Sequence, residues 1–345
     1  MSGVSVIIKA LNEEANIARS IESALRAISG VGGEVVLADA LSSDQTVQIA
    51  RRFPITIVQL RDVADRACGS GPQLGFQHAS GEFIYLLDGD MELQPGFIEA
   101  ALPHFEAEPN LAGIGGLIEE AGSLDLEYSA RQSRNRPDEK PGYVTHLGCG
   151  GLYRAEALRQ AGYFSNRNLH GYEELELGLR LGSAGWKLKR IDTPAIRHHH
   201  QHLGTYSLLA KKWRGGFLLG AGELLRSAIG KSYLPQVLKE LNYLFVAGCW
   251  MLMLLLALLV PMTLPLRLAV AVAVLSAPVA FMSIVKRDVR MGFYSVFAWC
   301  VALAGATRGA FRRQVDPLKP IASRVLQRGE SLQAAPNTCR EVAKP

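Results

Sequence analysis

Along its first 200 residues, the chain alternates short apolar runs with longer segments that have apolar residues at helical spacing. Apolar runs that end in polar turns are typical of buried strands. The predicted strands cover residues 4–8, 34–38, 55–60, 83–87, 112–119 and 186–191. The predicted helices cover residues 16–28, 43–53, 72–79, 95–108, 156–161 and 173–184. This alternation predicts an α/β domain with a mostly parallel sheet that is covered by helices on both faces.

Three apolar segments in the last third of the chain approach the length of a membrane-spanning helix, which is about 20 residues. They cover residues 241–260, 266–285 and 293–311. Pro261 and Pro265 mark a tight turn after the first segment, so the first two segments are expected to form a helical hairpin. Residues 206–240 mix Leu and Phe with Lys and Arg, which is typical of helices that lie in the membrane interface.

Basic residues beside these segments indicate the topology, because Lys and Arg accumulate on the cytoplasmic side of membranes. A hairpin returns Lys286, Arg287 and Arg290 to the cytoplasm, whereas a third crossing would leave Arg312 and Arg313 outside. The third segment either crosses, re-enters or lies in the interface, and its pattern slightly favours a crossing. Because the N-terminus lacks a secretory signal, we expect a multi-pass inner-membrane protein with its N-terminal domain in the cytoplasm.

The composition adds little beyond this division of the chain. The formal net charge of +5 lies largely beside the apolar segments, so it does not indicate nucleic-acid binding. The five cysteines are scattered without a CxxC pair, so they predict neither a zinc site nor a disulfide framework. We expect a domain at 1–205, interfacial helices at 206–240, membrane segments at 241–311 and a basic, loosely ordered tail at 312–345.

Acidic residues follow three of the predicted strands. Asp88 and Asp90 flank Gly89 at the end of an apolar strand, where the motif is either a turn or a site for Mg²⁺ or Mn²⁺. Asn12-Glu13-Glu14 follows the first strand, and Asp39 ends the second. Since ligands bind at the carboxyl ends of parallel strands, three polar loops at one sheet edge favour a binding site.

Three further motifs carry two interpretations each. Gly150-Gly151 is either a flexible turn or a place where the backbone approaches a ligand closely. Glu173 and Glu174 open a predicted helix, whose dipole favours acids at that end whether or not they are functional. The histidines that follow the last predicted strand either bind metal or are solvated loop residues; they are His198, His199, His200 and His202.

Taken in order, these motifs resemble those of the family 2 inverting glycosyltransferases, which have the GT-A nucleotide-diphospho-sugar transferase fold. The resemblance covers roughly the first two-thirds of the chain, and the ordered set is far more specific than any one piece. The matching pieces are Asn12-Glu13-Glu14, Asp39 with Ser42-Ser43-Asp44, Ser80-Gly81-Glu82, Asp88-Gly89-Asp90, Gly150-Gly151-Leu152-Tyr153-Arg154 and Gly171-Tyr172-Glu173-Glu174.

The resemblance implies roles for these residues. The residues implied in nucleotide and donor binding are Asn12, Glu14, Asp39, Asp88, Gly150 and Gly151. The implied ligands of Mg²⁺ or Mn²⁺ are Asp90, Asp88, His198 and His200. Glu173-Glu174 occupies the place of the family's acidic pair, whose second member serves as the catalytic base, so Glu174 inherits that role.

The chain departs from the family pattern in places. Ala40 stands where a second acid is common, and Pro72-Gln73 stands where Arg-Asn is common. The Gln-x-x-Arg-Trp motif of processive polysaccharide synthases is absent from the sequence, which favours the transfer of one or a few sugars.

The expected function is therefore a membrane-anchored inverting glycosyltransferase that moves a sugar from a nucleotide-diphospho-sugar, with UDP the favoured nucleotide, to a lipid-linked or membrane-proximal acceptor. A polyprenyl-phosphate sugar synthase of the same family is the alternative within this class. An inactive nucleotide-sugar-binding scaffold and an export component are alternatives from other classes. Ionisable residues are few in the apolar segments, which disfavours an export pathway.

Overall fold

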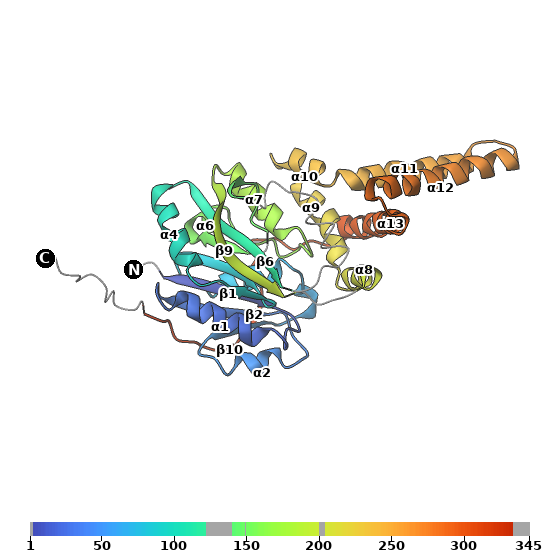
Figure 1. Ribbon diagram of the computed structural model, residues 1–345. Helices are drawn as coiled ribbons and strands as arrows, with labels where there is room; N and C mark the ends of the chain where they lie inside the picture. Colours follow the sequence, from blue (N-terminus) through green and yellow to red (C-terminus); the bar gives the residue numbers. More distant parts are fainter. Residues whose placement is uncertain (1–2, 122–139, 149, 200–203, 334–345) are drawn as a thin grey trace. The chain divides into compact units, whose positions relative to one another are not determined.

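The computed structural model describes residues 3–121, 140–148, 150–199 and 204–333 (Figure 1). The chain divides into two compact units. The first unit contains Met1–Thr205 together with Gln314–Pro345, and the second contains Tyr206–Arg313.

The first unit is an α/β domain. Its strands are β1 (Val4–Ala10), β2 (Gly33–Asp39), β3 (Thr56–Leu60), β4 (Phe83–Asp88), β5 (Met91–Leu93), β6 (Leu111–Ala121), β7 (Gly142–Val144), β8 (Gly151–Arg154), β9 (Lys187–His199) and β10 (Ser323–Gln327). Its helices are α1 (Ile17–Ile28), α2 (Thr46–Ala50), η1 (Val63–Asp65), α3 (Ser70–Phe76), α4 (Phe97–Ala107), α6 (Ala155–Gln160) and α7 (Glu173–Ser183).

These strands form one mixed sheet in the order β10-β3-β2-β1-β4-β8-β6-β9-β5, and β7 pairs with β9. The neighbours β3, β2, β1 and β4 are parallel, as the strand–helix alternation predicts. Antiparallel pairs flank these strands on both sides, where β10 pairs with β3 and β8 pairs with β4, and β5 also pairs antiparallel with β9. The fold class predicted from the motifs is confirmed.

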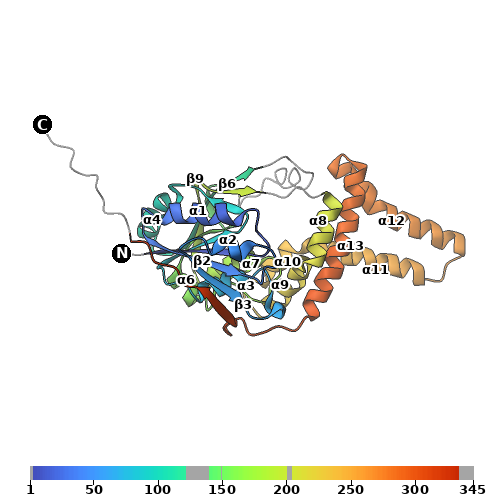
Figure 2. The same ribbon diagram turned by 90° about the horizontal axis from the view of Figure 1, so that it is seen from below.

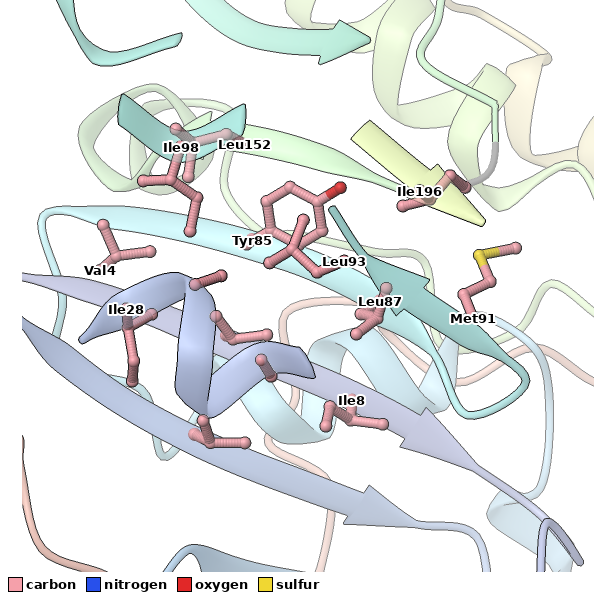
Figure 3. Close-up of a cluster of buried hydrophobic side chains, with 14 of the residues drawn as sticks. Val4, Ile8, Ile28, Tyr85, Leu87, Met91, Leu93, Ile98, Leu152 and Ile196 are labelled. Atoms are coloured by element: carbon pink, nitrogen blue, oxygen red, sulfur yellow. The ribbon is translucent and has the colours of Figure 1, made fainter. Parts of the chain in front are cut away.

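Successive residues of β1 face opposite sides of the sheet, and both sides are buried. Val6 and Ile8 pack on the face that α1 and α4 cover, and Ile7 packs on the face that α3, α6 and α7 cover. Figure 3 shows part of the first cluster, in which Ile28 of α1 and Ile98 of α4 lie over the strands. A sheet buried on both faces explains why the central strands read as continuous apolar runs.

Residues 312–345 do not form the loosely ordered tail that we expected, as far as they are described. Ser323–Gln327 pairs antiparallel with β3. Ile321 is buried, and its backbone exchanges two hydrogen bonds with the Gln77 side chain, of 2.7 and 3.1 Å. The expectation was wrong because β3 would otherwise end the sheet with unpaired backbone groups, which this strand satisfies. Residues 334–345 lie outside the described part of the chain.

The second unit is entirely helical. Its elements are α8 (Thr205–Arg214), η3 (Phe217–Leu219), α9 (Gly220–Ala228), α10 (Leu234–Glu240), α11 (Asn242–Leu259), α12 (Leu264–Lys286) and α13 (Val289–Phe311). By length and composition, α11, α12 and α13 are each candidates to cross a membrane, and α13 is the least apolar of them. Most side chains of α11 and α12 are exposed, as is expected of helices that could face lipid.

The helices α11 and α12 form the expected hairpin (Figure 1), and α13 runs crosswise to it (Figure 2). The Trp250 indole donates a hydrogen bond of 2.8 Å to the Val274 carbonyl, which ties the two arms together. Gly292, near the start of α13, packs on Ser283 near the end of α12. At its other end, α13 lies beside Leu244 near the start of α11.

Both ends of α13 thus lie at the open end of the hairpin, opposite the turn that joins its two arms. A helix that begins and ends at one end of a hairpin runs across that end, rather than alongside the arms. The third segment thus differs in direction from the two arms of the hairpin, and by length and composition it remains a candidate to cross a membrane.

Candidate active site

A lysine joins two of the predicted acidic motifs. Lys9 of β1 lies in register with Asp88 of β4, so both side chains leave the sheet at the same edge. Lys9 Nζ is 3.2 Å from Asp88 Oδ1 and 3.1 Å from Glu173 Oε1 at the start of α7. The sequence reasoning missed Lys9, although a lysine near the end of an otherwise apolar strand was a signal that could have found it.

The ionisation of Lys9 is set by these neighbours. Burial by itself lowers the pKa of Lys9, but the carboxylates of Asp88, Glu173 and Glu174 together raise that pKa well above its ordinary value. Burial disfavours the charged form of Asp88 too and so raises the pKa of Asp88, and the charge of Lys9 opposes that rise. Lys9 is therefore a permanent cation at the floor of an otherwise acidic site.

Glu174 has the environment of a general base. Its Oε1 accepts a hydrogen bond of 2.9 Å from the Gly150 N–H. Burial, together with the charges of Glu173 and Asp88, raises the pKa of Glu174 to about 7, although Lys9 and the hydrogen bond oppose the rise. A carboxyl group with a pKa near 7 can both accept and release a proton at neutral pH.

Glycine is required where the chain enters β8. Gly150 has a φ of +91°, and a Cβ atom there would lie 2.4 Å from the Leu86 carbonyl oxygen of β4. Gly151 has a φ of +158°, and its Cβ would lie 2.7 Å from Leu147 Cδ1. Because Gly150 and Gly151 have no side chains, their backbone can pack directly against β4, and the Gly150 N–H can point at Glu174.

Replacing Gly150 by Ala is expected to lower the free energy of unfolding by about 2–4 kcal/mol, because both the left-handed backbone and the contact with Leu86 oppose a Cβ. Thermal unfolding of the detergent-purified protein measures the effect. Gly148→Ala is the matched control, since no atom lies within 4 Å of its Cβ position. Equal melting temperatures for the two variants would contradict this account.

Asp90 and His198 form a second pair near the end of β4. Pairing of β5 with β9 brings them together, and Asp90 Oδ2 lies 3.3 Å from His198 Nε2. Burial raises the pKa of Asp90, but the hydrogen bond and charge of His198 outweigh it and lower that pKa. His199 instead bonds to Glu92 Oε1 at 2.6 Å. His200, the other histidine predicted as a ligand, lies outside the described residues.

The three predicted metal ligands that the structure describes, Asp88, Asp90 and His198, do not form a preassembled cluster. Within the described part of the chain, no three His, Cys, Asp or Glu side chains converge as a metal site. Asp88 is paired with Lys9, and Asp90 is paired with His198. A carboxylate with an imidazole nevertheless fits a divalent ion such as Mn²⁺, because such ions are commonly held by one or two protein side chains and completed by substrate phosphates.

The predicted nucleotide-binding residues join the loops that follow β1 and β2. Asn12 Oδ1 accepts the Ser43 N–H at 2.8 Å, and Glu14 Oε2 accepts the Gln45 N–H at 3.0 Å. These contacts hold the two loops side by side at the carboxyl end of the parallel strands, where Lys9 and Asp88 also lie.

Asp39 is fully buried at the end of β2. Its Oδ2 accepts hydrogen bonds from Gln59 Nε2 at 2.8 Å and from the Ser42 N–H at 3.1 Å. Arg66, which the sequence reasoning missed, donates to the carbonyls of Ala40 and Leu41. Because these side chains fix the loop after β2, its backbone is preorganised.

Comparison with known proteins adds independent findings. Residues 5–162 match the model of glycosyl transferase family 2. An N-acetylglucosaminyl-diphospho-decaprenol L-rhamnosyltransferase of Mycobacterium tuberculosis is 27% identical over 208 residues, covering 49% of this chain and 67% of that protein. A dolichol-phosphate mannosyltransferase of Pyrococcus furiosus is 25% identical over 126 residues, covering 35% of each chain.

A solved structure shows the same fold. The mannosyltransferase PcManGT of Pyrobaculum calidifontis, in complex with GDP-Man and Mn²⁺, superposes with a TM-score of 0.57 at 18% identity. The superposition covers 90% of this chain and 87% of that one. With the acidic edge of its sheet, its family match and these similarities, this chain carries a family 2 glycosyltransferase domain of the GT-A fold, followed by three candidate membrane helices.

Proposed function

We propose that this glycosyltransferase is a membrane-anchored, inverting enzyme that moves a sugar from a nucleotide-diphospho-sugar, with UDP the favoured nucleotide, to a lipid-linked acceptor. The observation that carries the proposal is Glu174, a carboxyl group with a pKa of about 7 beside the Lys9–Asp88 pair. An acid that is half-ionised at neutral pH suits removal of a proton from an attacking hydroxyl group.

In this proposal each group at the sheet edge has one task. Glu174 takes the proton of the acceptor hydroxyl as its oxygen attacks the anomeric carbon. The Gly150 N–H holds the Glu174 carboxylate in one orientation. Lys9 holds Asp88 and Glu173 by ion pairing and limits the rise in the Glu174 pKa. Asn12, Glu14 and Asp39 hold the loops that receive the nucleoside.

Asp90 and His198 are the residues that would hold a divalent ion, and Asp88 is close in sequence to complete the motif. When bound, Mg²⁺ or Mn²⁺ would neutralise the charge that develops on the diphosphate leaving group. The Mn²⁺ in the PcManGT complex supports this assignment by analogy.

The membrane helices support a lipid-linked acceptor. The two relatives named above carry decaprenol and dolichol phosphate in their names. We place the α11–α12 hairpin across the inner membrane, with α13 in the interface and the catalytic unit in the cytoplasm. This topology returns Lys286, Arg287, Arg312 and Arg313 to the cytoplasmic side, as the positive-inside tendency favours.

Nucleotide release by the purified full-length protein in nanodiscs tests the function. The assay offers UDP-, GDP- and dTDP-sugars with Mn²⁺ or Mg²⁺ and a bacterial membrane lipid extract. Metal-dependent turnover of one donor that requires the extract is the expected result. Binding of nucleotide without turnover of any donor would favour the scaffold alternative.

Asp90→Asn is expected to lower kcat by at least about 100-fold, because a neutral amide binds a divalent ion far more weakly than a carboxylate does. Asp192→Asn, an exposed acid of β9, is the matched control and should retain full activity. Excess Mn²⁺ should recover part of the Asp90→Asn activity. Full activity of this variant at limiting Mn²⁺ would refute the role of Asp90.

A further inference from the structure

An apolar cavity of about 420 Å³ lies within the second unit, among α9, α11 and α13. Its volume is typical of pockets that bind small molecules. Its lining residues are Ala221, Gly222, Leu225, Leu241, Leu244, Phe245, Gly248, Cys249, Leu252, Leu303, Ala306, Thr307, Ala310 and Phe311. The Thr307 hydroxyl donates to the Leu303 carbonyl at 2.8 Å, so it leaves this wall effectively apolar.

On one side of the cavity, α9 and α13 pack closely against each other. A Cβ on Gly222 of α9 would lie 1.7 Å from the Ala306 carbonyl oxygen of α13. A Cβ on Gly309 of α13 would lie 2.0 Å from the carbonyl oxygen of Leu219, which precedes α9. Small residues thus lock α9 against α13. Gly248 of α11, by contrast, has no atom within 4 Å of its Cβ position, so space remains on that side.

Cationic residues stand beside one end of the cavity. Arg226 of α9 donates to the Arg312 carbonyl at 2.6 Å and to the Ala310 carbonyl at 3.3 Å. Arg312 Nη1 lies 3.6 Å from Glu223 Oε1, and the exposed Arg313 follows it. Ala310 and Phe311 line the cavity, so these arginines lie next to its apolar wall. A ligand that fits this arrangement has an apolar chain and an anionic head.

The cavity also lies at the depth where such a head resides. It is formed by the first half of α11 and the last third of α13, that is, at the open end of the hairpin where α13 runs across it. If the hairpin crosses the bilayer, this end is at the interface, where lipid phosphates lie and where Arg226 and Arg312 would meet them.

We propose that this cavity binds the phosphate-proximal isoprenoid units of the acceptor lipid, with Arg226, Arg312 and Arg313 facing its phosphate. The inference rests on the proposed function, because the acceptor class decides between an isoprenoid and a phospholipid. Gly248 leaves open space on the α11 side of the cavity, which suits the methyl branches of an isoprenoid chain. A diacyl phospholipid would place one of its two chains outside a cavity of this size.

Photolabelling tests the proposal without any need for turnover. Full-length protein in nanodiscs is irradiated with a diazirine-bearing farnesyl phosphate, and labelled peptides are identified by mass spectrometry. We expect labels on α9, α11 and α13 lining residues, and we expect unlabelled undecaprenyl phosphate to compete while added phosphatidylethanolamine does not.

Gly248→Phe and Leu303→Trp fill the cavity from two different helices, and each should lower labelling at least fivefold. Met253→Phe is the matched control, since Met253 is exposed on α11 and does not line the cavity. Comparable elution of all variants on size-exclusion chromatography checks their folding. Loss of labelling in only one filled variant would still support the site if that variant elutes as the parent does.

Three outcomes would overturn the proposal: labels spread over the exposed faces of α11 and α12, competition by phosphatidylethanolamine, or unchanged labelling in both filled variants. A labelled cavity in a protein that transfers no sugar to lipid would separate the two claims, because the cavity would stand while the proposed acceptor reaction failed. Transfer to a lipid acceptor with undiminished efficiency in both filled variants would support the proposed acceptor reaction and overturn the role of the cavity.

Discussion

Replacing Glu174 by Gln should lower kcat at pH 8 by about 1,000-fold, within the range of about 100- to 10,000-fold expected for loss of a general base. The substitution keeps the size of the side chain and an oxygen that can accept the Gly150 N–H. It removes only the proton acceptor. Initial rates with saturating donor and acceptor measure the effect, and Glu99→Gln, an exposed acid in the first turn of α4, is the matched control.

The parent enzyme should show the ionisation of Glu174 in its pH profile. Since the base acts when it is ionised, kcat should rise about tenfold per pH unit below a pKa of about 7 and level off above it. Glu174→Gln should lose this limb. A parent profile that is flat between pH 5 and pH 8 would argue against Glu174 as the base.

As pH rises, the free energy of unfolding should fall, whereas kcat rises. The folded-state pKa of Glu174 is raised from 4.5 to about 7, so between these values the native state binds more protons than the unfolded state. The parent protein therefore loses stability as pH rises through this window, by up to about 3 kcal/mol. Glu174→Gln lacks this loss, so its melting temperature should exceed that of the parent at pH 8 and approach it near pH 4.5.

This pair of measurements also separates the two acceptor classes. A lipid phosphate is already anionic and needs no base, so a polyprenyl-phosphate sugar synthase would keep substantial activity in Glu174→Gln. A hydroxyl acceptor on a lipid-linked glycan would not. For either acceptor, Glu174→Gln should be more stable than the parent at pH 8. If the variant keeps its activity and also shows this gain in stability, the buried, acidic environment of Glu174 is correct and the acceptor needs no base.

Replacing Lys9 by Met should have the second-largest effect. Removal of the cation leaves the carboxylates of Asp88 and Glu173 together at the sheet edge, where their side chains are 29% and 12% exposed. Loss of one partner of a buried ion pair costs about 3–5 kcal/mol, and partial exposure reduces this to about 2–3 kcal/mol. Thermal unfolding at pH 8 measures this loss, which should shrink at pH 5 because burial raises the pKa of Asp88 and so favours its protonation.

The pH profile distinguishes an electrostatic role of Lys9 from a merely structural one. Because the Lys9 charge lowers the pKa of Glu174, its removal should shift the rising limb of kcat to higher pH. At pH 7 the rate should fall at least tenfold, with partial recovery at pH 9. Lys9→Arg keeps the charge and should keep the position of the limb. An unshifted limb in Lys9→Met would show that Lys9 does not act on the base.

Much of the first unit could be predicted because local patterns decide it. Central strands such as β1 and β2 are buried on both faces, so their apolar runs stand out between polar loops. The carboxyl ends of parallel strands meet at one edge, so the sequence predicts that Asp39 and Asp88 lie at the same edge, as they do. The identity of the domain rests on the order of short motifs, which the sequence displays directly.

The sequence could not show which side chains pair with one another. Lys9 meets Glu173 across 164 positions of chain, and the antiparallel pairing of β5 with β9 selects His198 as the partner of Asp90. The pKa of Glu174 depends on burial and on three charges from different elements. Such contacts depend on long-range packing, for which no local pattern exists.

The sequence by itself therefore determined the fold class of the catalytic domain, its family and its acidic motifs, because these follow from periodicity and motif order. Only the tertiary structure decided that Lys9 is the cation of the site, that Ser323–Gln327 closes the edge of the sheet, and that both ends of α13 lie at one end of the hairpin. Each of these depends on segments that are distant in the chain and meet only when the hydrophobic surfaces between them are buried.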